Sequence, residues 1–172
     1  MKVDMKKVIR NIADFPIEGV LYRDITPLLL SNEIFSEICD RIYHRYSDRE
    51  IDKIAAIESR GFIFGSVVAS RLNKGLILVR KEGKLPSKKI KESYSLEYGE
   101  ECLEIHVDSI EKGDKVLIID DLLATGGTAA ATCRMIDKLG GEVEELCFLI
   151  ELSDLEGRKK LSGRTVFSLV IY

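Results

Sequence analysis

Short apolar segments that alternate with helical stretches constrain the fold of this chain more than any other feature. Ile54–Ile57, Leu76–Val79 and Val116–Ile119 have the length and composition of buried strands. Helices are expected after the first and the third of them, at residues 62–72 and 128–139. Continuous apolar strands separated by helices are typical of a parallel sheet that is covered on both faces. The sequence therefore predicts an α/β fold with a mainly parallel twisted sheet flanked by helices.

The remaining elements are expected on both sides of this pattern. Residues 2–12 are predicted to form a short helix that ends before Pro16. Apolar residues then recur at helical spacing from Ile34 to Tyr46, with Ser31 or Asn32 as the expected N-cap. Residues 80–100 are polar and are predicted to be irregular, apart from a hairpin at 94–99. Further strands are expected at residues 102–107, 146–150 and 166–171.

Composition narrows the class of protein. The chain has 172 residues and 45% hydrophobic residues, which fits one compact domain with a real core. Its 26 basic and 29 acidic residues give a net charge of −3, which argues against a general nucleic-acid binder. The first residues are too charged for a signal peptide, and no apolar run approaches the length of a membrane span.

The cysteines and histidines point to a reducing compartment without a dedicated metal site. Cys39, Cys102, Cys133 and Cys147 are widely spaced in apolar stretches and form no CxxC pair, so they are predicted to be buried free thiols in the cytoplasm. His44 and His106 have no second His or Cys at ligand spacing. Both are therefore interpreted as surface or packing residues.

Polar clusters follow three of the predicted strands, where the carboxyl ends of a parallel sheet build binding sites. The most informative stretch is Asp120–Thr128, which joins two aspartates to Thr125-Gly126-Gly127-Thr128. The glycines let successive N–H groups converge, and the following helix adds its N-terminal N–H groups and dipole, so this loop is suited to a phosphate. Carboxylates repel phosphate, and they suit instead the two hydroxyls of a ribose or water on a magnesium ion. A solvated turn with a helix cap is the competing interpretation.

The other two clusters are basic or mixed. Glu58-Ser59-Arg60-Gly61 exposes backbone N–H groups and places one planar guanidinium beside them. Arg80, Lys81 and Lys84 begin a lysine-rich stretch that is suited to pyrophosphate, although such runs are commonly solvated loops. The hairpin at 94–99 is a candidate flap in which Tyr94 and Tyr98 exclude water and Glu97 transfers a proton.

The stretch VLIIDDLLATGGT, at residues 116–128, resembles the signature of the type I phosphoribosyltransferases, which bind 5-phosphoribosyl 1-pyrophosphate (PRPP). Five further stretches are similar to the adenine branch of that family and occur in the same order, at 14–29, 58–65, 80–86, 94–99 and 103–106. The resemblance implies transfer of the phosphoribosyl group of PRPP to adenine, giving AMP and pyrophosphate, with Mg²⁺ held mainly by PRPP and water. It also implies a cytoplasmic homodimer that binds neither membranes nor nucleic acid.

Site residues follow from the same resemblance, matched position by position. Ribose hydroxyls are assigned to Asp120 and Asp121, and the 5′-phosphate to Ala124, Thr125, Gly126, Gly127 and Thr128. The residues expected at pyrophosphate are Ser59, Arg60, Arg80, Lys81 and Lys84. Those expected at adenine are Leu21, Tyr22, Arg23, Arg60 and Leu122. Glu97 corresponds to the catalytic acid of a flap at about 84–100, in a single domain with a hood at about 1–30 and a core at 31–172.

Three alternatives remain open at this point. The chain could use hypoxanthine, guanine or xanthine, because base choice depends on main-chain groups that a sequence does not reveal. It could be a regulator that senses PRPP or a nucleotide without turnover, since a fold does not fix a function. A Rossmann-type nucleotide binder is disfavoured because the GxGxxG fingerprint is missing.

Overall fold

The computed structural model describes residues 3–96 and 99–172 of the chain. Backbone contacts divide it into two compact units, Met1–Arg45 and Tyr46–Tyr172. Among the described residues, no helix has the length and apolar character needed to cross a membrane. All four cysteines are free thiols, and three of them are buried while Cys102 is half-buried.

The first unit begins with a helix of one turn rather than the predicted helix over residues 2–12. Helix α1 (Met5–Val8) ends at once, and β1 (Arg10–Ala13) pairs antiparallel with β2 (Leu21–Asp24). The prediction was wrong because pairing with β2 satisfies the backbone groups of β1. An ion pair of 3.4 Å between Arg10 and Asp24 joins the two strands.

Two helices complete this unit. They are α2 (Thr26–Leu30) and α3 (Asn32–Tyr46). The predicted N-cap is confirmed at Ser31, whose hydroxyl accepts the N–H of Ile34 at 3.4 Å. The apolar positions Ile38 and Ile42 are buried, as the helical spacing indicated.

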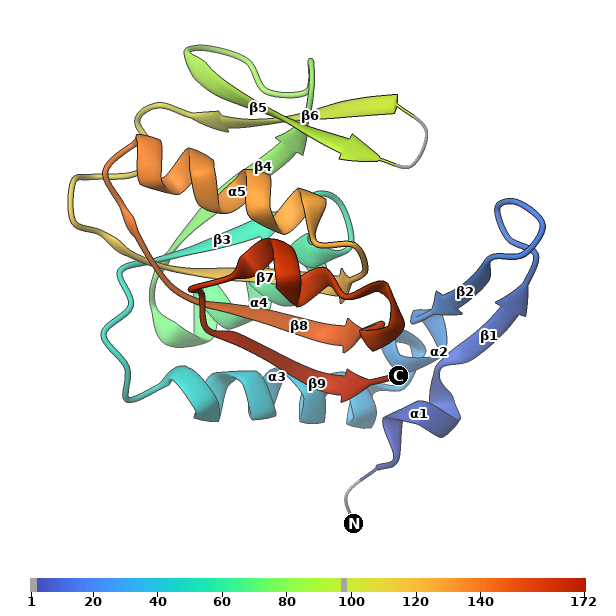
Figure 1. Cartoon of the computed structure of the whole chain (residues 1–172). Coiled ribbons are helices and arrows are strands. Elements are labelled where there is room, and N and C mark those ends of the chain that lie inside the picture. The colour runs from blue at the N-terminus through green and yellow to red at the C-terminus, as the bar shows by residue number, and fades with distance from the viewer. Residues whose placement is uncertain (1–2, 97–98) are drawn as a thin grey trace. The chain divides into compact units, whose positions relative to one another are not determined.

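The second unit is built on a seven-stranded sheet (Figure 1), which confirms the predicted α/β class with a mainly parallel sheet. Its strand order is β5-β6-β4-β3-β7-β8-β9, and the five strands from β4 to β9 are parallel. The parallel strands are β3 (Lys53–Ile57), β4 (Gly75–Lys81), β7 (Lys115–Leu123), β8 (Glu142–Glu151) and β9 (Val166–Ile171). Two short 3₁₀ helices, η1 (Ser153–Leu155) and η2 (Gly157–Leu161), connect β8 to β9.

Helices α4 (Gly61–Leu72) and α5 (Gly127–Lys138) are the crossover helices of this sheet. In Figure 1, α5 lies in front of the sheet and α4 lies behind it. Right-handed crossovers that run in opposite directions from the sheet centre require this arrangement. Beneath α5 a buried apolar cluster joins alternate residues of β3, such as Ala55 and Ile57, to the inner face of the helix.

The stretch predicted to be irregular holds a long hairpin. Strand β5 (Lys89–Leu96) pairs with β6 (Gly99–His106) without interruption, from Lys89 opposite His106 to Leu96 opposite Gly99. The many lysines hid this strand, because they occupy one face of it. Lys89 and Lys91 face a carboxylate of β6, while Ile90 packs against the apolar cluster on the other face.

Candidate active site

Three adjacent strands bring the predicted clusters to one edge of the sheet. β4, β3 and β7 are neighbours and run parallel, so their carboxyl ends lie together. The basic stretch begins with the last two residues of β4, Glu58–Gly61 follows β3, and the phosphate-type loop follows β7. The sequence thus placed all three clusters at a common edge, as expected for a ligand site in an open α/β sheet.

A pocket lies at the end of β7, where that strand passes into α5. Its lining consists of Asp120 and the continuous stretch 122–129. Gly126 has φ of 78°, a left-handed conformation that favours glycine, and the chain turns there directly into the first turn of α5. The N–H groups of that turn have no partner within the helix, so the pocket presents donors and a positive helix end to an anion.

The two aspartates belong to β7 itself rather than to the loop after it, because β7 stays paired with β8 as far as Leu123. Adjacent strand residues start toward opposite faces, but the two carboxylates stay close enough to interact, and the N–H of Asp121 donates to Asp120 Oδ1 at 2.8 Å. Asp120 is partly exposed and lines the pocket. Asp121 is buried, and its carboxylate lies 2.8 Å from Nε of Arg60. Asp120 therefore supplies a carboxylate to the pocket directly, whereas Asp121 holds Arg60 in place.

Burial also changes the titration of these aspartates. Desolvation and the charge of Asp121 raise the pKa of Asp120 well above its ordinary value. Desolvation raises the pKa of Asp121 too, although Arg60 opposes this. Both groups therefore favour ligands with donors, such as hydroxyls, that stabilise their charged forms.

Gly61 allows the pocket lined by Asp120 and residues 122–129, named the phosphate pocket here after the ligand predicted from the sequence, and the Glu58–Gly61 turn to approach each other. A Cβ at this position would lie 2.9 Å from both Asp120 Oδ1 and the carbonyl oxygen of Ile119. The peptide bond between Glu58 and Ser59 is cis. Ser59 and Arg60 thus lie just before α4, next to the glycine that contacts the Asp120 carboxylate.

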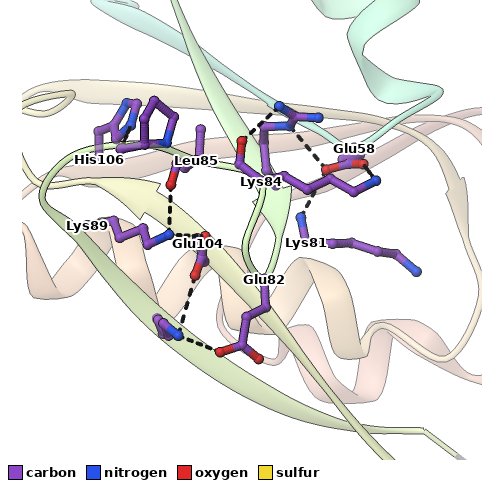
Figure 2. A network of polar contacts seen from close by, with 11 residues as sticks. Glu58, Lys81, Glu82, Lys84, Leu85, Lys89, Glu104 and His106 are labelled. Atoms are coloured by element: carbon purple, nitrogen blue, oxygen red, sulfur yellow. Dashed lines mark hydrogen bonds and ion pairs between the residues drawn. The ribbon is translucent and has the colours of Figure 1, made fainter.

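Glu58 gathers the basic residues around one carboxylate (Figure 2). Lys84 Nζ lies 2.6 Å and Arg80 Nε 3.2 Å from its oxygens, and the N–H of Lys81 donates to it at 3.0 Å. The side chain is only 7% exposed, yet Lys84, the Lys81 N–H and Arg80 outweigh desolvation and lower the pKa of Glu58. Because these cations already bind one carboxylate, they are suited to bind another anionic group.

The ammonium group of Lys81 does not belong to the cluster around Glu58. Its Nζ lies 3.2 Å from Glu101 of β6, on the other side of β4 from Arg80. Glu101 also accepts a hydrogen bond of 2.6 Å from the hydroxyl of Tyr94. Burial and Glu101 raise the pKa of Tyr94 to about 12, and Thr128 of the phosphate loop opposes the shift. Tyr94 is thus a buried link between the hairpin and that loop.

The remaining predicted site residues belong to the first unit, to the pocket after β7 or to the part outside the described residues. Glu97 and Tyr98, the expected flap acid and flap aromatic, fall outside the described residues. Leu21, Tyr22 and Arg23 lie on β2 in the first unit, where the ring of Tyr22 meets that of Phe15 edge-on at 5.1 Å. Leu122 lines the phosphate pocket.

Two residues that support the site were missed from the sequence. Gly157 of η2 touches the phosphate loop so closely that a Cβ would lie 2.2 Å from the carbonyl oxygen of Ala124. Glu104 of β6 is a fully buried carboxylate beneath the basic stretch. Neither residue had a clear signal in the sequence, because Glu104 alternates with the apolar Leu103 and Ile105, which predicts a solvated face, and Gly157 lay in an ordinary polar stretch.

Known proteins share this fold and much of this sequence. Residues 28–170 match the model of the phosphoribosyl transferase domain, which defines the chain as a protein of the phosphoribosyltransferase class. The adenine phosphoribosyltransferase of Thermotoga maritima is 56% identical over 171 residues, which cover 99% of each chain. The chain thus belongs to the adenine phosphoribosyltransferase family.

Solved structures of adenine phosphoribosyltransferases support the same family assignment. The adenine phosphoribosyltransferase of Thermoanaerobacter pseudethanolicus has a TM-score of 0.95 at 45% identity, with 98% of each chain covered. The enzyme of Saccharomyces cerevisiae, solved with adenine and an imino-altritol bisphosphate, has a TM-score of 0.91 at 37% identity, with 96% of each chain covered.

Proposed function

We propose that this chain transfers the 5-phosphoribosyl group of PRPP to adenine, giving AMP and releasing pyrophosphate. The observation that carries the proposal is the junction of two anion sites at one sheet edge. The pocket after β7 suits a phosphate beside a ribose, and Arg80 with Lys84 forms a second cationic cluster nearby in the strand order. A substrate with a phosphate at one end of a ribose and a pyrophosphate at the other uses both.

The phosphate pocket is the proposed site of the 5′-phosphate and ribose. Backbone N–H groups at the start of α5 and the hydroxyls of Thr125 and Thr128 donate to the phosphate. Asp120 accepts from a ribose hydroxyl, and Asp121 completes the site through Arg60. The free enzyme keeps a carboxylate with a raised pKa in the pocket, so a hydroxyl donor relieves an unfavourable environment.

The basic cluster is the proposed site of the leaving group. Departure of pyrophosphate builds positive charge on the sugar and negative charge on the leaving oxygens. Arg80 and Lys84 stabilise that negative charge, and Ser59 and Arg60 contribute donors at the start of α4. In the free enzyme these cations pair with Glu58. When PRPP binds, they release Glu58 and pair with the pyrophosphate. Lys81, whose ammonium pairs with Glu101, acts there through its N–H group.

Mg²⁺ is proposed to enter with PRPP. Within the described ranges there is no group of three or more His, Cys, Asp or Glu able to hold a metal ion, and the pocket offers Asp120 as a single partly exposed carboxylate. That donor set fits an ion held mainly by phosphate oxygens and water. When bound, the ion would neutralise charge on the leaving pyrophosphate.

Adenine is proposed to bind beneath a hood made by the first thirty or so residues. The ring of Tyr22 offers a face for stacking, main-chain groups of Leu21 and Arg23 read the purine edge, and Leu122 packs on the base. Glu97 of the flap is the proposed group that manages the proton of the purine nitrogen, while the flap excludes water. Hood, core and flap together form one catalytic domain in this proposal.

We also propose a cytoplasmic homodimer. Four free thiols fit a reducing compartment. Leu76 and Leu78 of β4 are 38% and 40% exposed, which gives the second unit apolar surface that another copy would cover.

The test is turnover with Mg²⁺ and PRPP, in which adenine, hypoxanthine, guanine and xanthine are supplied separately. Nucleotide should form from adenine alone. Product from a 6-oxopurine would overturn the base assignment while keeping the reaction. No product from any base, with PRPP still bound, would favour the regulator over the enzyme.

The role of Glu97 has its own test. Glu97→Ala should lower turnover about 10²-fold or more, by loss of proton transfer, while AMP affinity stays close to that of the parent. Turnover at the parental level would leave the flap only as a lid.

A further inference from the structure

A buried carboxylate lies beneath the loop that carries Lys84. Glu104 is 0% exposed and sits on β6, opposite Arg80 of β4 and Lys91 of β5. Its neighbours on β6, Leu103 and Ile105, belong to the apolar cluster under α5, so Glu104 points to the other face of the sheet. The reaction proposed above gives this side chain no role.

Charges and dipoles of the hairpin and the loop hold this carboxylate in its ionised form. Lys89 Nζ lies 2.9 Å and Lys91 Nζ 3.5 Å from its oxygens. Burial opposes ionisation, but Lys89 and the backbone N–H groups of Gly83 and Leu85 outweigh it and lower the pKa of Glu104. Among the described residues, neither oxygen has a partner with ordinary hydrogen-bond geometry, and the ammonium groups of Lys89 and Lys91 are the cations at ion-pair distance.

The stabilising N–H groups lie on either side of Lys84. Figure 2 shows the loop between β4 and β5 folding over Glu104, with Lys89 reaching both the carboxylate and the loop. Lys89 Nζ donates to the carbonyl of Leu85 at 2.7 Å, and His106 Nε2 lies 2.6 Å from the carbonyl oxygen of Pro86. The backbone around Lys84 is therefore fastened to the base of the hairpin.

Lys84 itself points the other way, toward Glu58. Its Nζ lies 2.6 Å from a Glu58 oxygen, its side chain is 51% exposed, and its carbonyl accepts a hydrogen bond of 3.0 Å from Arg80 Nη1. A long, half-exposed lysine loses much rotamer entropy when it binds an anion. A fixed backbone beneath it reduces the freedom that must be lost, which favours tight binding of the anion.

From these contacts we propose that Glu104 is a positioning residue for pyrophosphate, which holds the loop so that Lys84 meets the leaving group. This inference rests on the proposed function, because it assigns Lys84 to pyrophosphate. Glu104 touches no substrate in this scheme. It acts on the loop through Lys89, whose ammonium lies 2.9 Å from the carboxylate and donates to the carbonyl of Leu85, and through the charge that it presents to the N–H groups of Gly83 and Leu85. The same contacts join the base of the proposed flap to the pyrophosphate cation, since Lys89 and Glu104 belong to the two strands of that hairpin.

The experiment is a double-mutant cycle on Glu104 and Lys84. Glu104→Gln should raise the KM for PRPP and the Kd for Mg-pyrophosphate about tenfold, with the KM for adenine changed less than about twofold. The double variant Glu104→Gln/Lys84→Ala should bind Mg-pyrophosphate no more weakly than Lys84→Ala alone. Additive losses, or equal losses toward PRPP and adenine, would overturn the inference.

The matched control is Glu92→Gln on the same hairpin. Glu92 pairs with Arg134 at 2.8 Å and with Lys138, both on α5, so it carries a paired charge without contact to the loop. Its pyrophosphate affinity should equal that of the parent. A loss as large as that of Glu104→Gln would reduce the effect to general destabilisation of the hairpin.

Amide exchange on the ligand-free protein separates this inference from the proposed function. Glu104→Gln should speed exchange at Gly83 and Leu85, and Lys89→Gln should do the same if the first variant fails to fold. If amide exchange at Gly83 and Leu85 is unchanged in the folded variant, Glu104 does not anchor the loop, whether or not the protein has enzymatic activity. Absent turnover with Lys84-dependent pyrophosphate binding would count against the proposed reaction and leave the anchoring role standing.

Discussion

At the residue scale, Asp120 and Asp121 are neighbours in β7 but have different surroundings. Asp121 is buried against Arg60, whereas Asp120 faces the pocket without a cation of its own at ion-pair distance among the described residues. Desolvation and its neighbour raise the pKa of Asp120, so the folded protein binds that proton more tightly than the unfolded chain does. Stability from this group is present at low pH and declines as pH rises from the ordinary pKa through the raised one.

Asp120→Asn should therefore stabilise the free protein near neutral pH and impair the enzyme. We expect a higher Tm at about pH 7, at roughly 2–4 °C for each kcal/mol of unfavourable charge removed, and a difference that shrinks toward about pH 4. Turnover should fall about 10²–10³-fold, because the ribose loses its acceptor. Scanning calorimetry at several pH values measures the first effect.

Asp114→Asn is the control of opposite sign. Lys53 lies 2.8 Å from Asp114 and lowers the pKa of that carboxylate, so its charge stabilises the fold at neutral pH and this stability is lost as pH falls. The variant should have a lower Tm near neutral pH. A lower Tm for Asp120→Asn as well would show that the ionised carboxylate of Asp120 does not destabilise the folded protein near neutral pH.

The sequence predicted which residues gather at this edge, but not how each is used. Glycines, threonines and aspartates in one loop were sufficient to infer a phosphate pocket beside a ribose site. Side-chain direction was not, because it depends on how far β7 extends. Pairing with β8 carries β7 past the aspartates, so both belong to the strand, where Asp120 lines the pocket and Asp121 is buried against Arg60.

At the element scale, the phosphate loop takes its shape partly from η2. The backbone at Gly157 lies against that of Ala124 and Gly126, where a Cβ on Gly126 would meet the Gly157 carbonyl oxygen at 2.4 Å. Arg158 fixes this contact through two bonds of 2.6 and 2.7 Å to the buried carboxylate of Glu151, at the end of β8. Loop and support are about thirty residues apart, so local sequence patterns did not connect them.

Gly157→Ala should displace the phosphate loop, because its Cβ would lie 2.2 Å from the carbonyl oxygen of Ala124. We expect kcat/KM for PRPP to fall about 10–100-fold, since a small misplacement of a binding group is costly. Gly75→Ala is the matched control, because its Cβ would meet only Lys53 Cγ at 3.8 Å. Steady-state kinetics should show no change there, and a fully active Gly157→Ala would refute the support assigned to η2.

The same scale explains why one strand was missed. Strand β5 was expected to be irregular because lysines dominate its sequence, and its alternation became apparent only with the partner strand beside it. Lys89 and Lys91 pair with Glu104, a contact between residues more than ten positions apart. Strand preference depends on such cross-strand partners more than on the residues of the strand alone.

At the scale of the whole molecule, one sheet edge is proposed to hold two anion sites for the two ends of one substrate. Alternating strands and helices were enough to predict the parallel sheet and therefore the edge. The division of contacts at residues 45 and 46 was not foreseen, because α3 reads as one uninterrupted helix across it. Both sites depend on β3, β4 and β7 staying neighbours.

The most direct test of two joined sites is the reverse reaction, measured as adenine released from AMP with Mg²⁺. Adenine should be released only when pyrophosphate is present, with PRPP as the second product, because pyrophosphate alone can attack the sugar when water is excluded. Release of adenine and ribose 5-phosphate from AMP without pyrophosphate would contradict this prediction. That result would mean that the phosphate pocket works without the basic cluster, as in a nucleotide hydrolase.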